Sequence, residues 1–205
     1  MRRFHCWLFL TFGFSSLLLA GDDQRLRAQI GHVSSVSGLF NSQGVTLGAD
    51  RALGARISFE NLLTKKLGLE VGLGTSQHDF TLAIFNGVRR ASEFRMTPLT
   101  LAGNLHFGDS KRVDSFFGAG VAYVSIGDFS PSGSGENVSV DAELTWMAQY
   151  GLDIALGSKR QINSPSHRWM LGLSISYMDV DAQAGNMPLP IEAVGVYAGM
   201  VWRFR

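Results

Sequence analysis

Histidine is the side chain best suited to acid–base or metal chemistry near neutral pH. Four histidines follow the first twenty residues of this sequence, namely His32, His78, His106 and His167. A metal site requires several ligands at close spacing, and these four lie far apart in the chain. The sequence therefore predicts no metal site and no cofactor. We expect His78 and the adjacent Asp79 to form a solvated pair on the surface of a long loop.

A serine becomes a nucleophile when a nearby base takes its proton. The stretch SPSHRW (164–169) places Ser166 beside His167, which raises a lipid-modifying enzyme as one class of function. Adjacent residues of a strand point to opposite faces, however, and both are solvated if the stretch is a turn. We therefore expect this pair to have no catalytic role, and an enzyme is the least favoured of three function classes.

The charge of the chain is nearly balanced, with 18 basic and 17 acidic residues among 205. A nucleic-acid-binding domain carries a basic patch or stripe, and no cluster of lysine or arginine stands out here. The composition therefore predicts no nucleic-acid partner.

The first twenty residues are typical of a secretory signal peptide. A basic start, Met1-Arg2-Arg3, precedes the apolar run Cys6–Ala20, which is shorter than a membrane-spanning helix. We expect cleavage after Ala20, with Ala28 as the alternative, so that residues 21–205 form one mature domain. That domain contains no cysteine and is held together without disulfides.

Downstream, apolar residues alternate with small or polar ones at a period of two, which indicates β-strands. The alternating segments are 53–60, 67–74, 98–107, 117–123, 146–156, 169–178 and 192–204. Bacterial single-chain barrels have an even number of strands, and we expect an eighth strand within Gln29–Gly38. The pattern predicts an all-β fold, an eight-stranded antiparallel transmembrane β-barrel with up-and-down topology.

Two kinds of barrel would show this alternation, and they differ in the face that meets water. A soluble barrel, such as a lipocalin, points its apolar face inward and carries many charged residues outside. Here the second face consists mainly of Gly, Ala and Ser with isolated charges. Small residues suit the narrow interior of an eight-stranded barrel, so the apolar face is predicted to contact lipid.

The isolated charges then lie in the interior, where opposite charges must pair. We expect a lumen polar cluster that consists of Arg56, Glu70, Asn104, His106, Asp153 and Arg203. Such a cluster is either a structural plug that rigidifies the barrel or a gate for solutes, and we favour the plug. His106 is interpreted as a hydrogen-bonded interior group rather than a catalyst.

Aromatic residues of the apolar face gather at the two ends of the predicted strands. Trp169, Trp202 and Phe204 lie near the short turns or the C-terminus, whereas Trp146 and Tyr177 lie near the long connections. Aromatic belts at both interfaces are typical of membrane barrels. Aromatic residues scattered by chance through a protein core would explain this placement less well.

The connections alternate in length, as in outer-membrane barrels. The segments 61–66 and 108–114 are short, and the segments 77–96 and 127–143 are interpreted as long loops that shape an outer mouth. These loops contain the apolar residues Phe80, Leu82, Ile84, Phe85 and Phe129. The apolar residues suit the capture of an apolar ligand, and packing within the loops explains them equally well.

Three stretches resemble the OmpW-like family of outer-membrane proteins. They are LGARISFENLLTKKLGLEVGLG (53–74), MTPLTLAGNLHFGDSKRVDSFFGAGVAYVSI (96–126) and the segment from WMAQYGLDIALG to RWMLGLSISYMDVD (146–181), together with the terminal strand. The likeness covers about two-thirds of the mature chain, and its motifs are those of barrels in general. Arg205 follows Phe204, whereas outer-membrane strands usually finish on the aromatic residue itself.

The resemblance implies a monomeric barrel in the outer membrane of a Gram-negative bacterium, surrounded by outer-membrane lipid. It also implies that the barrel-assembly machinery recognises the C-terminal strand. The role that it implies is the binding or passage of small hydrophobic molecules, which leave sideways through the wall. The alternatives are a structural or adhesive barrel without transport, and the lipid-modifying enzyme considered above.

Overall fold

The computed structural model describes residues 23–35, 41–42, 45–49, 51–84, 87–108, 112–127, 142–157, 169–184 and 187–204. The predicted signal peptide, residues 1–20, lies outside these ranges and stays a prediction. No helix within the described ranges is long and apolar enough to cross a membrane.

The described chain consists mainly of β-strands. The strands are β1 (Asp23–Ser35), β2 (Asn41–Ser42), β3 (Val45–Ala49), β4 (Ala52–Leu62), β5 (Leu67–Ile84), β6 (Gly87–His106), β7 (Val113–Ile126), β8 (Glu143–Ala155), β9 (Trp169–Ala184) and β10 (Met187–Phe204).

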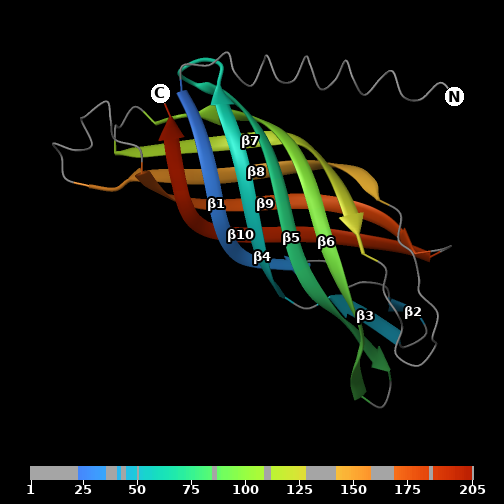
Figure 1. Cartoon of the computed structure of the whole chain (residues 1–205). Coiled ribbons are helices and arrows are strands. Elements are labelled where there is room, and N and C mark those ends of the chain that lie inside the picture. The colour runs from blue at the N-terminus through green and yellow to red at the C-terminus, as the bar shows by residue number, and fades with distance from the viewer. Residues whose placement is uncertain are drawn as a thin grey trace, which may run out of the picture.

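Eight of these strands close into a barrel in which every neighbouring pair is antiparallel (Figure 1). β1 pairs with β10 on one side and with β4 on the other, and β5 pairs with β6, so the sheet has no open seam. Closure matters because an unpaired backbone group would have no partner in hydrocarbon. The predicted fold class, an eight-stranded antiparallel up-and-down barrel, is confirmed.

The two ends of the barrel differ. At one end, here called the terminal end, β1 begins beside the last residues of β10, and Leu63–Lys66 make a tight connection between β4 and β5. The opposite end, here called the hairpin end, carries β2 and β3 beside the extension of β5 (Figure 1). The terminal end corresponds to the side with short turns in membrane barrels.

The prediction of a long loop at residues 77–96 is wrong. β5 and β6 remain paired through Ile84 and Gly87, so only residues 85–86 separate the two strands. Phe80, Leu82 and Ile84 therefore belong to β5 rather than to a loop, and Phe85 and Phe129 lie outside the described residues. The outward positions Thr75, Gln77 and Asp79 are polar, so the apolar alternation of the preceding residues is interrupted there, and a segment without alternation is typical of a loop.

The first strand was placed too late in the sequence. β1 begins at Asp23 rather than at Gln29, and it pairs along its whole length with β10. Its inward-facing residues include two arginines, Arg25 and Arg27, which are almost completely buried. Cleavage after Ala28 would remove both of them, so we propose cleavage after Ala20.

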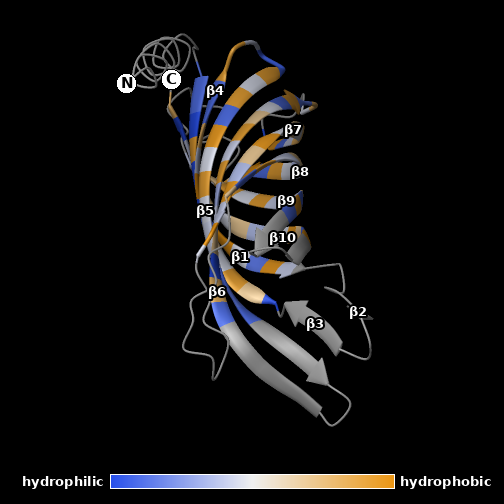
Figure 2. Cartoon of the chain, turned by 90° about the vertical axis from the view of Figure 1, so that its right-hand side faces the viewer, coloured by the Kyte–Doolittle hydropathy of each residue, from blue (hydrophilic) through white to orange (hydrophobic). Residues whose placement is uncertain are grey.

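The strands alternate between outward and inward residues as the pattern requires (Figure 2). In β9, Leu173 and Ile175 are exposed on the outer wall, whereas the alternate residues Ser174 and Ser176 are buried. The same alternation holds for the other barrel strands in the described ranges, for example in β4, where each outward apolar residue flanks a buried one. The apolar face therefore meets lipid, and the small and polar face fills the interior.

The outward aromatic residues form two clusters at opposite ends of the wall. Near the terminal end the rings of Trp169 and Trp202 stack 5.6 Å apart, and Phe204 lies 4.5 Å from Trp202. Nearer the hairpin end Trp146 and Tyr177 lie 5.1 Å apart. These positions suit the two interfaces of a bilayer.

Replacing Leu173 by Arg tests which face meets lipid. The residue is outward and central among the lipid-facing residues of β9, so the charge is expected to cost about 2–4 kcal/mol of unfolding free energy in a bilayer. Denaturant titration in lipid vesicles measures this cost. Gln77→Arg is the control, because Gln77 is also exposed but already bonds to Glu93 (2.6 Å) beyond the apolar band. Equal tolerance of both changes would contradict the orientation.

Candidate functional site

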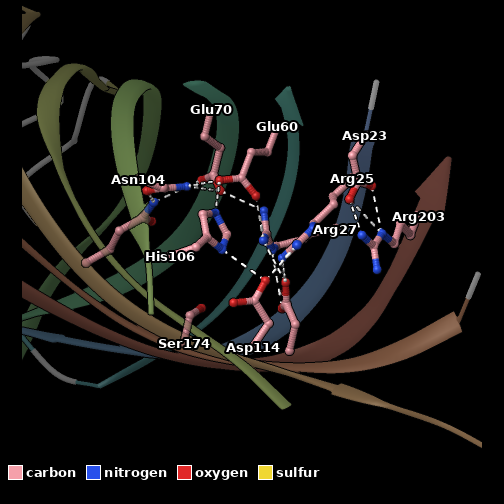
Figure 3. Close-up of polar contacts among 12 residues, drawn as sticks. Asp23, Arg25, Arg27, Glu60, Glu70, Asn104, His106, Asp114, Ser174 and Arg203 are labelled. Atoms are coloured by element: carbon pink, nitrogen blue, oxygen red, sulfur yellow. Dashed lines mark hydrogen bonds and ion pairs between the residues drawn. The ribbon is translucent and has the colours of Figure 1, made fainter. Parts of the chain in front are cut away.

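The interior of the barrel near the terminal end is filled by a network of charged and amide side chains, here called the polar plug (Figure 3). Its members are Arg25, Arg27, Arg56, Glu60, Glu70, Asn104, His106, Asp114, Gln149 and Asp153. They come from β1, β4, β5, β6, β7 and β8, so the plug links six of the eight barrel strands.

Arg27 is the centre of the polar plug. Its Nη2 donates to Asp153 Oδ2 at 2.7 Å and to Glu60 Oε2 at 2.8 Å, and its Nη1 donates to Glu70 Oε2 at 3.0 Å. The guanidinium is fully buried and lies 4.7 Å from the centre of the Phe116 ring. One cation is thus shared by three carboxylates, each from a different strand.

Arg25 and His106 complete the side of the plug nearest the terminal end. Arg25 Nη1 donates to Asp153 Oδ2 at 3.0 Å, and its Nη2 pairs with Asp114 Oδ2 at 2.6 Å. The two ring nitrogens of His106 lie 2.9 Å from Glu60 Oε1 and 3.0 Å from Asp114 Oδ2. A carboxylate only accepts hydrogen bonds, so both ring nitrogens must donate and the imidazole is positively charged.

The opposite side of the plug is closed by Arg56 and two amides. Arg56 Nη2 donates to Glu70 Oε1 and to Gln149 Oε1, the latter at 2.8 Å. Gln149 Nε2 donates to Asn104 Oδ1 at 2.8 Å, and Asn104 Nδ2 donates to Glu60 Oε1 at 2.7 Å. With His106 charged, four cations face the four carboxylates of Glu60, Glu70, Asp114 and Asp153, which leaves the plug neutral.

Five of the six residues predicted for the lumen polar cluster lie in the polar plug. The sixth, Arg203, instead pairs with Asp23 at the rim of the terminal end, where its side chain is 28% exposed. The other five members, Arg25, Arg27, Glu60, Asp114 and Gln149, were not predicted. Glu60 shares a face with Arg56 in the sequence pattern, whereas the arginines were missed because β1 was placed too late.

The interior nearer the hairpin end is apolar, and this part is here called the apolar layer. Its members are Val33, Phe94, Met96, Ala102, Ala122, Val124, Ile126, Met147, Met178, Val180, Ile191, Ala193 and Tyr197. The apolar layer lies next to the polar plug along the barrel axis, on the side of the hairpin end. The lumen therefore has an apolar half and a charged half. Sequence analysis described the interior only as small and lightly charged, because apolar inward residues interrupt the alternation at the strand ends.

The interpretation of His78 as a surface residue of a loop is wrong. His78 points into the barrel from β5 and is 3% exposed. Its Nε2 lies 2.9 Å from the hydroxyl of Ser76, and its ring stacks on Phe94 with the centroids 5.1 Å apart. The loop assignment hid this position, because a residue within a strand alternates with its neighbours and a residue in a loop does not.

The other chemical candidates give no catalytic arrangement. Ser166 and His167 lie outside the described residues. Within the described ranges, no group of three or more His, Cys, Asp or Glu residues could hold a metal ion. The carboxylates of the plug already bind arginine, so their chemistry is that of a structural charge network.

A closed barrel with a lipid-facing apolar wall and a charged interior defines an integral β-barrel protein of the outer membrane. The model of the OmpW family matches residues 25–204, and the chain belongs to that family. The predicted resemblance and the predicted location, the outer membrane of a Gram-negative bacterium, are confirmed.

Individual relatives are similar to this chain in sequence or in fold. Outer membrane protein W of Salmonella typhimurium is 26% identical over 130 residues, which are 62% of this chain and 58% of that protein. The crystal structure of OprG from Pseudomonas aeruginosa has a TM-score of 0.71 at 15% identity and covers 90% of this chain and 97% of its own. The structure of AlkL in lipid bilayers has a TM-score of 0.55 at 19% identity, with 90% and 91% covered. At these identities the solved structures show a common fold.

Replacing Arg27 by Ala tests the polar plug. The change removes one cationic partner from each of three buried carboxylates. Breaking a buried ion pair lowers the free energy of unfolding by about 3–5 kcal/mol. Arg203→Ala is the matched control, because it removes a partly exposed pair that contributes at most about 1 kcal/mol. Unfolding of both variants in lipid vesicles gives the two costs. Similar losses for the two variants would show that Arg27 is not the centre of the network.

Replacing Gly151 by Ala tests the packing that holds Phe116 over Arg27. A Cβ at Gly151 would lie 2.3 Å from Phe116 Cζ, so the ring must move. Overpacking of this kind costs about 1–3 kcal/mol. Gly103→Ala is expected to cause no loss, since a Cβ there meets nothing within 4 Å. Adding Phe116→Leu to Gly151→Ala should recover part of the stability, and a purely additive loss would contradict the contact.

Proposed function

We propose that the protein binds small hydrophobic molecules in its apolar layer and passes them across the outer leaflet, while the polar plug keeps the barrel closed to water. The observation that supports this proposal is the division of the lumen. A molecule that enters from the hairpin end meets apolar side chains first and a network of buried ion pairs next. A straight path to the terminal end would require those pairs to break.

The composition of the apolar layer supports binding rather than passive filling. Three of its members, Met96, Met147 and Met178, are methionines. Methionine is unbranched and polarisable, adapts to irregular shapes and is common on promiscuous binding surfaces. The layer can thus repack around guests of different outline, as a carrier of varied hydrophobic compounds requires.

The outer wall offers a place for such a molecule, or for lipid, beside β1. Two grooves of about 550 and 540 Å³ lie on the wall and share Ile30 and Ala198. They form because small residues such as Ala28 and Ala55 lie between protruding ones such as Leu53. Acyl chains of outer-membrane lipid fill these grooves in our account, and a hydrophobic molecule that leaves the apolar layer sideways joins them there.

Assembly completes the proposal. We infer that the protein is a monomer without catalytic activity, and that the barrel-assembly machinery engages β10, which ends in the aromatic pair Trp202 and Phe204. The paired plug serves as structure rather than as a gate, because its charges balance and its carboxylates are shared by buried arginines.

A structural or adhesive barrel is the second candidate, and the extended β5–β6 hairpin favours it. The hairpin continues past the last residues that β6 pairs with β7, and β3 joins its edge. A barrel of this class would display the hairpin outside the cell and would move no solute. Flux measurements separate it from the carrier.

Proteoliposomes provide the test, with n-decane as the apolar solute and potassium ions as the polar one. We expect decane to bind and exchange while ion conductance stays low. Met147→Gln places an amide in the apolar layer and should weaken decane binding about tenfold, the equivalent of 1.4 kcal/mol. Met170→Gln, at the terminal end with Ala155 and Val201, is the control and should leave binding unchanged. Absence of decane binding would leave the structural barrel as the better account.

A further inference from the structure

The apolar outer wall carries an exposed histidine beside β10. His32 of β1 lines the groove of about 550 Å³, and it is the one basic residue among the described residues of that lining. Its partners on the two neighbouring strands, Leu53 of β4 and Val196 of β10, are exposed apolar residues. Ionisable side chains that face lipid are rare in membrane proteins, so this position indicates a function.

His32 lies near the level of the head groups in the outer leaflet. Two residues further along β1, Ser34 pairs with Val194, which in turn pairs with Tyr177 of the aromatic cluster near the hairpin end. Aromatic residues of this kind mark the interface between hydrocarbon and water. The short turns of the terminal end face the periplasm, so the hairpin end lies on the side of the outer leaflet.

A second basic residue lies beside His32, further toward the head groups. Arg51 is exposed and directly precedes β4, two positions before Leu53, the residue that pairs with His32. A diagonal neighbour of this kind on an adjacent strand is within reach of a long side chain. Neither Arg51 nor His32 forms an ion pair with another residue in the described ranges, so both can approach one ligand together.

On the other side of His32 the wall is apolar and hollowed. Ile30 and Ala198 line both grooves, whose volumes are about 550 and 540 Å³. Sites for small molecules have volumes of roughly 300–1,000 Å³, and each groove lies within that range. Because the grooves face hydrocarbon and are lined mainly by apolar residues, an acyl chain fits them in both shape and chemistry.

From this arrangement we propose that the wall beside β1 binds a phosphorylated lipid of the outer leaflet. The acyl chains lie in the two grooves, and a phosphate contacts Arg51 and His32. Arginine binds phosphate through two parallel hydrogen bonds, and an imidazole N–H donates to the same group. Lipid A, the phosphorylated and multiply acylated anchor of lipopolysaccharide, has this chemistry. The site lies outside the barrel and does not depend on the passage of a solute through the apolar layer.

Charges on the neighbouring strands determine on which side of His32 the phosphate lies. Asp179 of β9 and Glu192 of β10 are cross-strand partners beyond the aromatic cluster, and their negative charges repel an anion. β1 separates them from Arg51, because the strand order is β4, β1, β10, β9. A second copy of the chain suits the site less well, since a two-fold contact through this wall brings another Arg51 rather than an anion.

The test compares lipid A with lipid A from which the phosphates have been removed, so that the acyl chains are identical. Native mass spectrometry of the full mature chain from an uncharged detergent measures the binding of each lipid to the wild type, His32→Leu, Arg51→Gln and the double variant. Lys65→Gln is the matched control, because it removes an exposed cation at the terminal end, on the other side of the bilayer. Heat-modifiable migration shows that each variant is folded.

We expect lipid A to bind the wild type about tenfold more tightly than its dephosphorylated form. This preference should shrink in each single variant, disappear in the double variant and persist in Lys65→Gln, while the dephosphorylated lipid binds all five proteins about equally. Ala198→Phe fills both grooves and should weaken the binding of both lipids, because the acyl chains lose their place.

Equal affinities of the wild type for the two lipids, or a preference that survives in the double variant, would overturn the proposed site. Displacement of lipid A by inorganic phosphate would also overturn it, because the site would then belong to a soluble anion. A dimer that lipid A dissociates would assign the grooves to a second copy instead. If the double variant does not fold, the two single variants decide. The binding of decane in the apolar layer is measured separately, so failure here leaves the proposed function intact.

Discussion

One buried guanidinium, that of Arg27, determines how the strands of this barrel can be arranged. It binds Glu60 on β4, Glu70 on β5 and Asp153 on β8 at the same time. A β-strand that slips by one residue turns every side chain to the other face. Such a slip of β1 would move this cation into lipid and would leave three carboxylates in the interior without it. Buried ion pairs are weak evidence for net stability, but they strongly penalise arrangements that leave them incomplete. The plug is thus best understood as a device that fixes register in a closed sheet.

The same constraint explains why the interior has two halves. Charges gather near the terminal end, where side chains of six strands meet in the plug (Figure 3), and the interior toward the hairpin end contains the apolar layer. Ion pairs and hydrogen bonds connect the members of the plug, and the apolar layer is held mainly by contacts between apolar side chains. A ligand can displace contacts in the apolar half at small cost, because its methionines adapt, whereas any path through the charged half must separate ions.

The fold could be predicted from the sequence because lipid and interior impose opposite demands on alternate residues. Segments such as 146–156 and 169–178 show this demand clearly, and their outward residues are those that the pattern selected. The site was predicted only in part. Glu70 and Asp153 were visible as charges among small residues, but their shared partner lies on β1, where the pattern is weak and adjoins the expected signal peptide. His78 was missed because its outward-facing neighbours Gln77 and Asp79 are polar and interrupt the apolar period on which strand assignment depends.

The central claim, that a water-excluded arginine network closes the barrel, is tested most directly by the exchange of guanidinium protons with solvent. Nuclear magnetic resonance of the protein in lipid nanodiscs can follow Arg27 and Arg203 in one sample. The account predicts that the Arg27 protons, which bind three buried carboxylates, exchange far more slowly than those of Arg203 at the rim. Equally rapid exchange at both residues would mean that water fills the lumen, and the closed plug would be refuted.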